Sequence, residues 1–244
     1  MDRINNYSLE TNLLLLIHSY TYFSYILIIF IYFILHTLYF ILIFMKAIFG
    51  LGNIEQEYKN TRHNIGFTIM DWLMKDSFSP TLNTNQTLNT LQEQRSSHAA
   101  TNQKWREEAK LNALIARNGN ILFIKPTNSM NNSGNCVKKI MGYYKILPTD
   151  ILVIHDDIDQ KIGNYKLIKN GGSGGHNGVE DIFKKLKTKE FRRLKIGIAP
   201  KVYEPSKHKA INFILKKFNK EEIEDLRIIF KKELRTIITE FIFS

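Results

Sequence analysis

Short apolar runs alternate with longer amphipathic stretches along most of the chain. The β-rich runs lie at about 46–50, 121–125, 151–155, 164–169 and 193–199, and the helical patterns at about 64–75, 134–146 and 178–187. Strands that alternate with helices of this length are typical of an open, twisted, mixed but mostly parallel sheet with helices on both faces. The pattern therefore predicts a single α/β domain over residues 46–244.

Two further helices are predicted in the C-terminal part. Residues 208–217 fit a short helix, and the next helix begins at Asn219 with Glu222 three residues later, which is a capping pattern. Apolar residues then recur at steps of three and four, at Ile223, Leu226, Phe230, Leu234, Ile237 and Phe241. A stripe of this kind should pack on the sheet.

Residues 1–45 form an apolar N-terminal extension. From Thr11 to Met45 there is no Asp, Glu, Lys or Arg, so the tract qualifies as a membrane-spanning helix, and it is too long for a typical signal peptide. However, the first strand is predicted to begin directly after Met45, which leaves no linker between a bilayer and the domain. Two interpretations stay open: translated upstream sequence with a mis-assigned start, or a membrane tether that keeps the domain in the cytoplasm. Membrane contact is expected only through residues 11–45.

Residues 77–102 interrupt the periodic pattern. They are rich in Ser, Thr, Asn and Gln, and their only charged residues are Glu93 and Arg95. This composition predicts a disordered surface insertion of low complexity, with a functional lid as the alternative.

Charge and cysteine content narrow the function classes. The formal net charge is +11, and because residues 1–45 hold one Arg, one Asp and one Glu, the remainder carries +12. A basic domain suits a polyphosphate partner such as RNA, although a general lysine bias explains the charge equally well. Cys136 is the only cysteine, which excludes an intrachain disulfide and a Cys-based zinc site and fits a reducing compartment.

Polar motifs follow the predicted strands or open the predicted helices. They are Gly50-Leu51-Gly52-Asn53 with Thr61-Arg62-His63-Asn64-Ile65-Gly66, Met130-Asn131-Asn132-Ser133-Gly134, His155-Asp156-Asp157-Ile158-Asp159, and Gly174-Gly175-His176-Asn177-Gly178. Active sites of α/β proteins are built in this way at the carboxyl ends of strands.

In this order, the motifs resemble those of bacterial-type peptidyl-tRNA hydrolase, an esterase that frees tRNA from prematurely released peptides. The similarity runs from about Met45 to the C-terminus, with the insertion at 77–102 as its one gap. It implies hydrolysis of the ester between peptide and tRNA by a monomer without a cofactor, acting in the cytoplasm on the acceptor end of peptidyl-tRNA. Two alternatives stay open: a non-catalytic RNA-binding member of the same fold, and a membrane-tethered scaffold.

The resemblance also assigns roles to single residues. Ester hydrolysis needs a base that activates water and a partner that fixes the tautomer of that base, and these roles fall to His63 and Asp156. Residues expected to contact the peptide or the tRNA end are Asn53, Tyr58, Asn131, Asn177 and His176. Because Asn132 or Ser133 accounts for the helix cap, Asn131 is left for the site.

The family holds a tRNA phosphate with basic side chains near its Gly-rich loop. The expected equivalents are Lys166 or Lys169 together with Lys195, with Arg192 and Arg193 nearby. One position that the family fills with a basic residue is Ile168 in this chain. No metal is expected at the acidic motif, because adjacent residues on a strand point to opposite faces.

Two departures from the family pattern concern the site loops. The expected Asn-Pro-Gly turn is Asn53-Ile54-Glu55, and Ser129 stands where an aromatic residue is expected. The first change should loosen the loop that carries Asn53 and places Glu55 near an anionic substrate. The second removes a packing group under Asn131. Because His63, Asp156 and the three asparagines remain, we expect activity to survive at a reduced level.

Overall fold

The computed structural model describes residues 20–35, 45–75, 104–200 and 210–244. The chain divides into two compact units, Met1–Phe44 and Met45–Ser244. Residues 20–35 of the first unit form a helix with exposed side chains. Within the described ranges, no helix is both long and apolar enough to cross a membrane. The predicted insertion at 77–102 and the start of the predicted helix at 208–217 lie outside the described residues.

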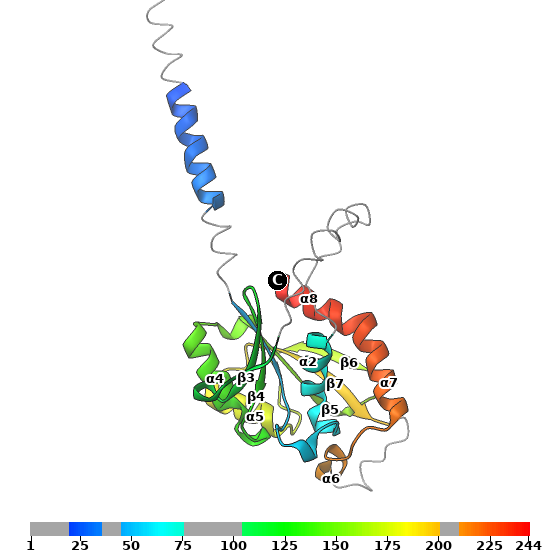
Figure 1. Ribbon diagram of the computed structural model, residues 1–244. Coiled ribbons are helices and arrows are strands. Elements are labelled where there is room, and N and C mark those ends of the chain that lie inside the picture. The colour runs from blue at the N-terminus through cyan, green and yellow to red at the C-terminus, as the bar shows by residue number, and fades with distance from the viewer. Residues whose placement is uncertain (1–19, 36–44, 76–103, 201–209) are drawn as a thin grey trace, which may run out of the picture. The chain divides into compact units, whose positions relative to one another are not determined.

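A seven-stranded mixed sheet forms the centre of the second unit, in the order β2-β3-β4-β1-β5-β7-β6 (Figure 1). Its strands are β1 (Lys46–Gly50), β2 (Arg106–Glu108), β3 (Ala113–Asn118), β4 (Ile121–Pro126), β5 (Ile151–Lys161), β6 (Tyr165–Lys169) and β7 (Arg192–Ala199). The four central strands β4, β1, β5 and β7 run parallel, and the outer strands pair antiparallel to their neighbours. The predicted fold class is confirmed, with the parallel pairing confined to the middle of the sheet.

Helices cover both faces of the sheet. The α-helices of this unit are α2 (Ile65–Lys75), α4 (Ser133–Tyr144), α5 (Asn177–Leu186), α6 (Ala210–Ile214), α7 (Lys220–Ile229) and α8 (Arg235–Phe243). Helices α2, α7 and α8 pack on one face, where alternate strand residues such as Ile48, Leu152 and Leu194 are buried. Helices α4 and α5 pack on the other face, against the intervening residues such as Phe49 and Val153. This alternation gives each face its own apolar core.

Single turns of 3-10 helix connect several of these elements. They are η1 (Gln56–Tyr58), η2 (Arg62–Asn64), η3 (Ala109–Leu111), η4 (Met130–Asn132) and η5 (Pro148–Asp150). Two of them, η2 and η4, lie directly before α2 and α4 and contain residues of the polar motifs.

The C-terminal helix confirms its predicted start and differs from its predicted stripe. Asn219 and Glu222 form the expected capping box. A π-helical turn, η7 (Phe230–Leu234), joins α7 to α8. Such a turn inserts one residue into the α-helical register, and as a result Ile238 is fully buried while Ile237 is only partly buried.

Strands β2 and β3 are absent from the sequence prediction, and β5 is longer than predicted. Strand β2 consists of Arg106, Glu107 and Glu108, all exposed, so it has no apolar signal, as is common for strands at a sheet edge. Strand β5 continues beyond residue 155 to Lys161 because its polar second half stays paired with β7 as far as Ala199, across an irregularity.

Candidate active site

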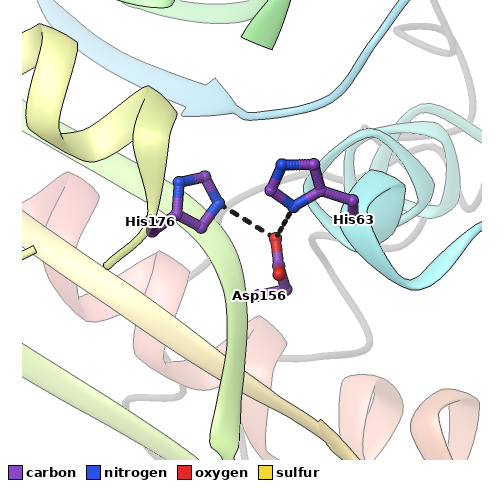
Figure 2. Close-up of side chains that lie close together, drawn as sticks. All are labelled: His63, Asp156 and His176. Atoms are coloured by element: carbon purple, nitrogen blue, oxygen red, sulfur yellow. Dashed lines mark hydrogen bonds and ion pairs between the residues drawn. The ribbon is translucent and has the colours of Figure 1, made fainter. Parts of the chain in front are cut away.

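His63 and Asp156 are in direct contact at the carboxyl end of the sheet. Asp156 lies on β5 and is 5% exposed, and His63 lies in η2 and is 7% exposed. His63 Nδ1 is 2.8 Å from Asp156 Oδ1. Because a carboxylate only accepts, Nδ1 carries the proton and Nε2 keeps a free lone pair. Figure 2 shows the second nitrogen of His63 pointing away from Asp156.

The backbone at Gly66 permits this contact. Gly66 is the second residue of α2, and a Cβ atom there would lie 2.5 Å from the Leu51 nitrogen and 2.6 Å from the Ile154 carbonyl oxygen. Only glycine lets the start of α2 approach the ends of β1 and β5 so closely. The spacing between His63 and Gly66 therefore serves to bring the imidazole to the strand end.

His176 reaches the same carboxylate oxygen from the opposite side (Figure 2). Its Nε2 lies 2.9 Å from Asp156 Oδ1, and its ring centroid lies 4.8 Å from that of His63. His176 is also the N-cap of α5, where its Nδ1 accepts a hydrogen bond from Val179 N at 3.3 Å. A nitrogen that accepts an N–H carries no proton, so Nε2 donates to Asp156 and both ring nitrogens are occupied. The sequence placed His176 in the site but did not predict these contacts.

The charge state of the cluster follows from burial and hydrogen bonding. Burial alone raises the pKa of the Asp156 carboxyl, but His176 and His63 outweigh it and hold that pKa well below its usual range. Next to it, His155 is fully buried, donates Nδ1 to the Asp156 carbonyl at 2.7 Å, and packs edge-on against His176. Burial, together with His176, holds the pKa of His155 well below 6.5. The site therefore contains an ionised carboxylate beside the neutral imidazole of His155.

An amide pair connects the loop after β1 to the turn that carries His63. Asn53 N donates to Asn64 Oδ1 and Asn64 Nδ2 donates to the Asn53 carbonyl, both at 2.8 Å. The Asn53 side chain accepts from Met130 N through Oδ1 at 2.8 Å. Asn53 therefore ties η4 to the site while its Nδ2 stays without a hydrogen bond to any described residue. The role of Asn64 was not predicted, although it stands beside His63 in the motif.

The other predicted substrate contacts lie on surrounding turns. Asn131 in η4 and Asn177 at the first position of α5 are exposed, and Tyr58 in η1 is half-buried. Tyr58 supports the loop through its carbonyl, which accepts from Thr61 N at 3.0 Å and Thr61 Oγ1 at 2.7 Å. No described side chain binds the Asn131 or Asn177 amides, which leaves both available to a ligand.

Asn132 is the N-cap residue of α4, one of the two predicted, but the side-chain hydrogen bond expected of a cap is not formed. The Ser133 hydroxyl donates to the Met130 carbonyl at 2.8 Å. Instead, Asp181 of α5 accepts from Gly134 N at 2.8 Å. A carboxylate from a neighbouring helix replaces the local cap, and local sequence cannot reveal such a partner.

A buried arginine holds the Gly-rich loop that leads to His176. Residues Asn170, Gly171, Gly174 and Gly175 have φ values of 68°, 94°, 63° and 76°. Three carbonyls of this loop, at residues 170–172, accept from Arg193 Nη2 at 2.9 to 3.2 Å. The left-handed backbone, which glycine adopts without strain, turns these carbonyls toward one cation. Arg193 is fully buried, so it supports the loop from inside.

The predicted phosphate-binding lysines fall into two groups. Lys166 of β6 pairs in register with Lys195 of β7, which places both side chains on one face of the sheet. Lys195 Nζ lies 2.6 Å from Asp157 Oδ2. Lys169 pairs instead with Arg192, and because successive strand residues alternate, this pair lies on the opposite face.

His63, Asp156 and His176 offer three metal-ligand atoms within 4.8 Å of one another. A metal-bound imidazole donates its other ring nitrogen to an acceptor. In His176 that other nitrogen faces the Val179 N–H, which is a donor. Binding of a cation at Nε2 would put two protons against each other, so the arrangement favours hydrogen bonding over metal coordination.

A cleft of about 340 Å³ adjoins the amide pair, and its lining includes Asn53, Asn64, Phe67, Asp71, Trp72 and Lys125. Lys125 is buried, pairs with Asp71, and lies over the Trp105 ring at 4.6 Å. Exposed Glu55 and Lys59 also contribute to this lining, so its charges balance. None of the three cluster residues lines the cleft. The cleft is therefore separate from the hydrogen-bonded cluster of His63, Asp156 and His176, and we place the candidate site at that cluster.

Comparison with known proteins identifies the family. Residues 47–242 match the family model described as peptidyl-tRNA hydrolase. The protein of that name from Pediococcus pentosaceus is 35% identical over 184 residues, covering 75% of this chain and 86% of the relative. The one from Mycoplasma capricolum subsp. capricolum is 37% identical over 189 residues, covering 78% and 89%. The crystal structure of peptidyl-tRNA hydrolase from Acinetobacter baumannii matches with a TM-score of 0.64 and 26% identity, over 82% of this chain and 88% of that one. Because these matches span the α/β unit that carries the site, the chain belongs to the peptidyl-tRNA hydrolase family.

Proposed function

We propose that this chain hydrolyses the ester between peptide and tRNA, with His63 as the general base. The observation that carries this proposal is the 2.8 Å contact between His63 Nδ1 and Asp156 Oδ1. That contact fixes the tautomer in which Nε2 can take a proton. The names of the relatives and of the matched crystal structure support the same reaction.

In the proposed reaction, His63 Nε2 takes a proton from a water molecule as the water oxygen bonds to the ester carbonyl carbon. The imidazolium that forms is stabilised by the ionised Asp156. The tetrahedral intermediate then loses the ribose oxygen of the tRNA, and the imidazolium returns its proton to that oxygen. The products are the peptide acid and free tRNA.

Amide groups around the base supply the proposed contacts to the peptide end. Asn53 Nδ2 is the best placed of these, because Met130 N and Asn64 fix the loop and the Asn53 amide. Exposed Asn131, Asn177 and half-buried Tyr58 complete the proposed contacts. Uncharged amides can donate to a developing oxyanion without adding a charge that opposes the base.

We assign the tRNA phosphate to Lys195 and Lys166, which lie side by side. Lys195 is 18% exposed at its side chain and is paired with Asp157, so a phosphate has to compete with that carboxylate. Lys169 and Arg192 belong to the other face and are proposed to make only peripheral contacts. A lysine binds phosphate as a point charge, without the fork of arginine.

The non-catalytic RNA-binding alternative is less well supported. It predicts loss of the base or of its carboxylate, and both are present and in contact. We further propose that the reaction needs no metal, that the enzyme acts as a monomer, and that it works in the cytoplasm, where translation supplies peptidyl-tRNA.

Peptide release by the full chain tests this proposal. Purified protein mixed with N-blocked peptidyl-tRNA should produce free tRNA and peptide acid with multiple turnovers, and excess chelator should leave the rate unchanged. Binding of the same tRNA without release would support the RNA-binding alternative. Strong inhibition by the chelator would show that the cluster holds a metal.

A further inference from the structure

The turn that carries His63 is anchored to the C-terminal segment of the domain. Arg62 N donates to the Lys216 carbonyl at 3.0 Å, and Phe218 N donates to the Asn60 carbonyl at 3.2 Å. Between them, Thr61 and Lys217 form an isolated antiparallel bridge. Because η2 is only three residues long, its orientation depends on such external contacts.

The side chain of Arg62 strengthens this anchor through Glu222. Arg62 Nη1 donates to Oε2 at 2.9 Å and Nη2 donates to Oε1 at 2.8 Å, which is a bidentate pair. The two side chains are 8% and 12% exposed. The rings of Phe213 and Phe218 lie 4.7 and 4.8 Å from the guanidinium carbon. Two parallel hydrogen bonds and two aromatic rings fix the guanidinium in both direction and plane.

Glu222 is itself fixed by the start of α7. Its Oε2 accepts from Asn219 N at 2.8 Å, and its own N donates to Asn219 Oδ1 at 2.8 Å. One carboxylate therefore closes the capping box and binds Arg62. The position of α7 is transmitted through this carboxylate to the residue next to His63.

We propose that Arg62 and Glu222 are positioning residues that aim His63 at Asp156. The inference rests on the proposed function of His63 as the base. Asp156 holds only one nitrogen of the imidazole, so the direction of the free Nε2 depends on the backbone of η2. A displacement of about 1 Å in a reacting group can cost about 100-fold in rate.

A purely structural ion pair would have different consequences. It would add to the stability of the fold but leave the direction of His63 unchanged once the protein is folded. The two roles are separated by measurements on folded protein that report on the imidazole itself.

Glu222→Gln in the full chain makes this separation. Glutamine keeps the length of the side chain and can still accept from Asn219 N, as in other capping boxes. It removes the charge and one acceptor, so the buried guanidinium loses its bidentate partner. We expect kcat to fall roughly 10- to 100-fold with little change in KM. The acid limb of the pH dependence of kcat/KM should also move, because His63 contacts Asp156 less well.

Asn219→Ala is the matched control. It removes the side-chain half of the capping box and weakens the start of α7. The backbone N of residue 219 remains, so Glu222 stays bound to it and to Arg62. This variant should lose thermal stability but keep the wild-type kcat and pH dependence. Arg62→Lys keeps the charge but not the fork of the guanidinium. Its kcat should therefore lie between that of Glu222→Gln and that of Asn219→Ala.

Proton NMR provides a readout that does not depend on turnover. The Nδ1 proton of His63, assigned by its absence in His63→Ala, should resonate in wild type and in Asn219→Ala and be lost or shifted in Glu222→Gln. If that signal, kcat and the pH dependence stay unchanged in folded Glu222→Gln, the positioning role is refuted while the proposed function stands. If wild type releases no peptide but the signal responds to Glu222→Gln as expected, the proposed function fails and the anchor stands.

Discussion

The two histidines on Asp156 come from opposite faces of the sheet and are held in different ways. His63 precedes α2, and its turn is fixed by a side-chain ion pair, Arg62 with Glu222. His176 precedes α5, and its loop is fixed by backbone carbonyls that converge on Arg193. The two histidines also differ in the hydrogen bonds that their ring nitrogens make. His176 uses both nitrogens, for Val179 N and for Asp156, whereas His63 Nε2 has no partner among the described residues.

This comparison separates a chemical role from a supporting one. A general base needs a lone pair that can reach the substrate. Of the two histidines on Asp156, only His63 has a ring nitrogen without a partner among the described residues, and the unpaired Nε2 of His155 is buried. The His176 side donates a second hydrogen bond to Asp156 Oδ1, which stabilises the ionised carboxylate and limits its movement. Two imidazoles on one oxygen are therefore not equivalent, although the sequence shows two similar His-Asn pairs.

The largest expected effect is the loss of His63. His63→Ala should reduce kcat by about 10²- to 10⁴-fold, because the other unpaired ring nitrogen beside Asp156 among the described residues, His155 Nε2, is buried. His176→Ala is the matched control at the same carboxylate. It should reduce kcat by less and lower stability by about 1 kcal/mol, through the lost helix cap. Equal losses of kcat in single-turnover assays of the two variants would contradict the assignment.

Asp156→Asn should have a smaller effect than His63→Ala, because it removes the charge and keeps the base. Hydrogen bonds to charged groups contribute about 1.5–3 kcal/mol, which corresponds to roughly a 10- to 100-fold loss of kcat. The measurement is kcat for the variant at several pH values, with circular dichroism to show that the fold persists. A loss as large as that of His63→Ala would mean that Asp156 does more than orient the imidazole.

The sequence predicts the parts of this site that have local signals. Apolar runs predict β1 and β5, and the polar residues that follow them include Asp156. The turn at His63 is marked by its neighbours Arg62 and Asn64.

Contacts between distant segments could not be predicted in the same way. Arg193 is fully buried, yet in the sequence it reads as one more surface cation. The cap of α4 comes from Asp181 on another helix, and strand β2 is recognised only through its pairing with β3. Arg193 and Asp181 act on segments that are remote in the chain, and β2 consists only of exposed residues, so none of the three has a local signal.

The smallest expected effect concerns stability, and it tests whether His155, on the His176 side of the cluster, is neutral in the folded protein. His155 packs against His176, is fully buried, and has a pKa held well below 6.5 by burial, with His176 adding to this and Asp156 opposing it. In the unfolded chain His155 takes up a proton near pH 6.5, and in the folded chain it stays neutral. The unfolded state thus binds more protons, and the free energy of unfolding should fall by up to about 1.4 kcal/mol per pH unit below 6.5.

Urea unfolding of wild type and His155→Asn between pH 5 and 7 measures this contribution. Asparagine can keep a donor to the Asp156 carbonyl but does not titrate, so the variant should show a shallower fall in stability as the pH decreases. The Asp156 carboxyl does not confuse the result. Its depressed pKa gives stability that is fully present above about pH 4, the unfolded value, and is lost only below it. An identical pH slope in both proteins would show that His155 is protonated in the fold, and the neutral packing against His176 would then have to be abandoned.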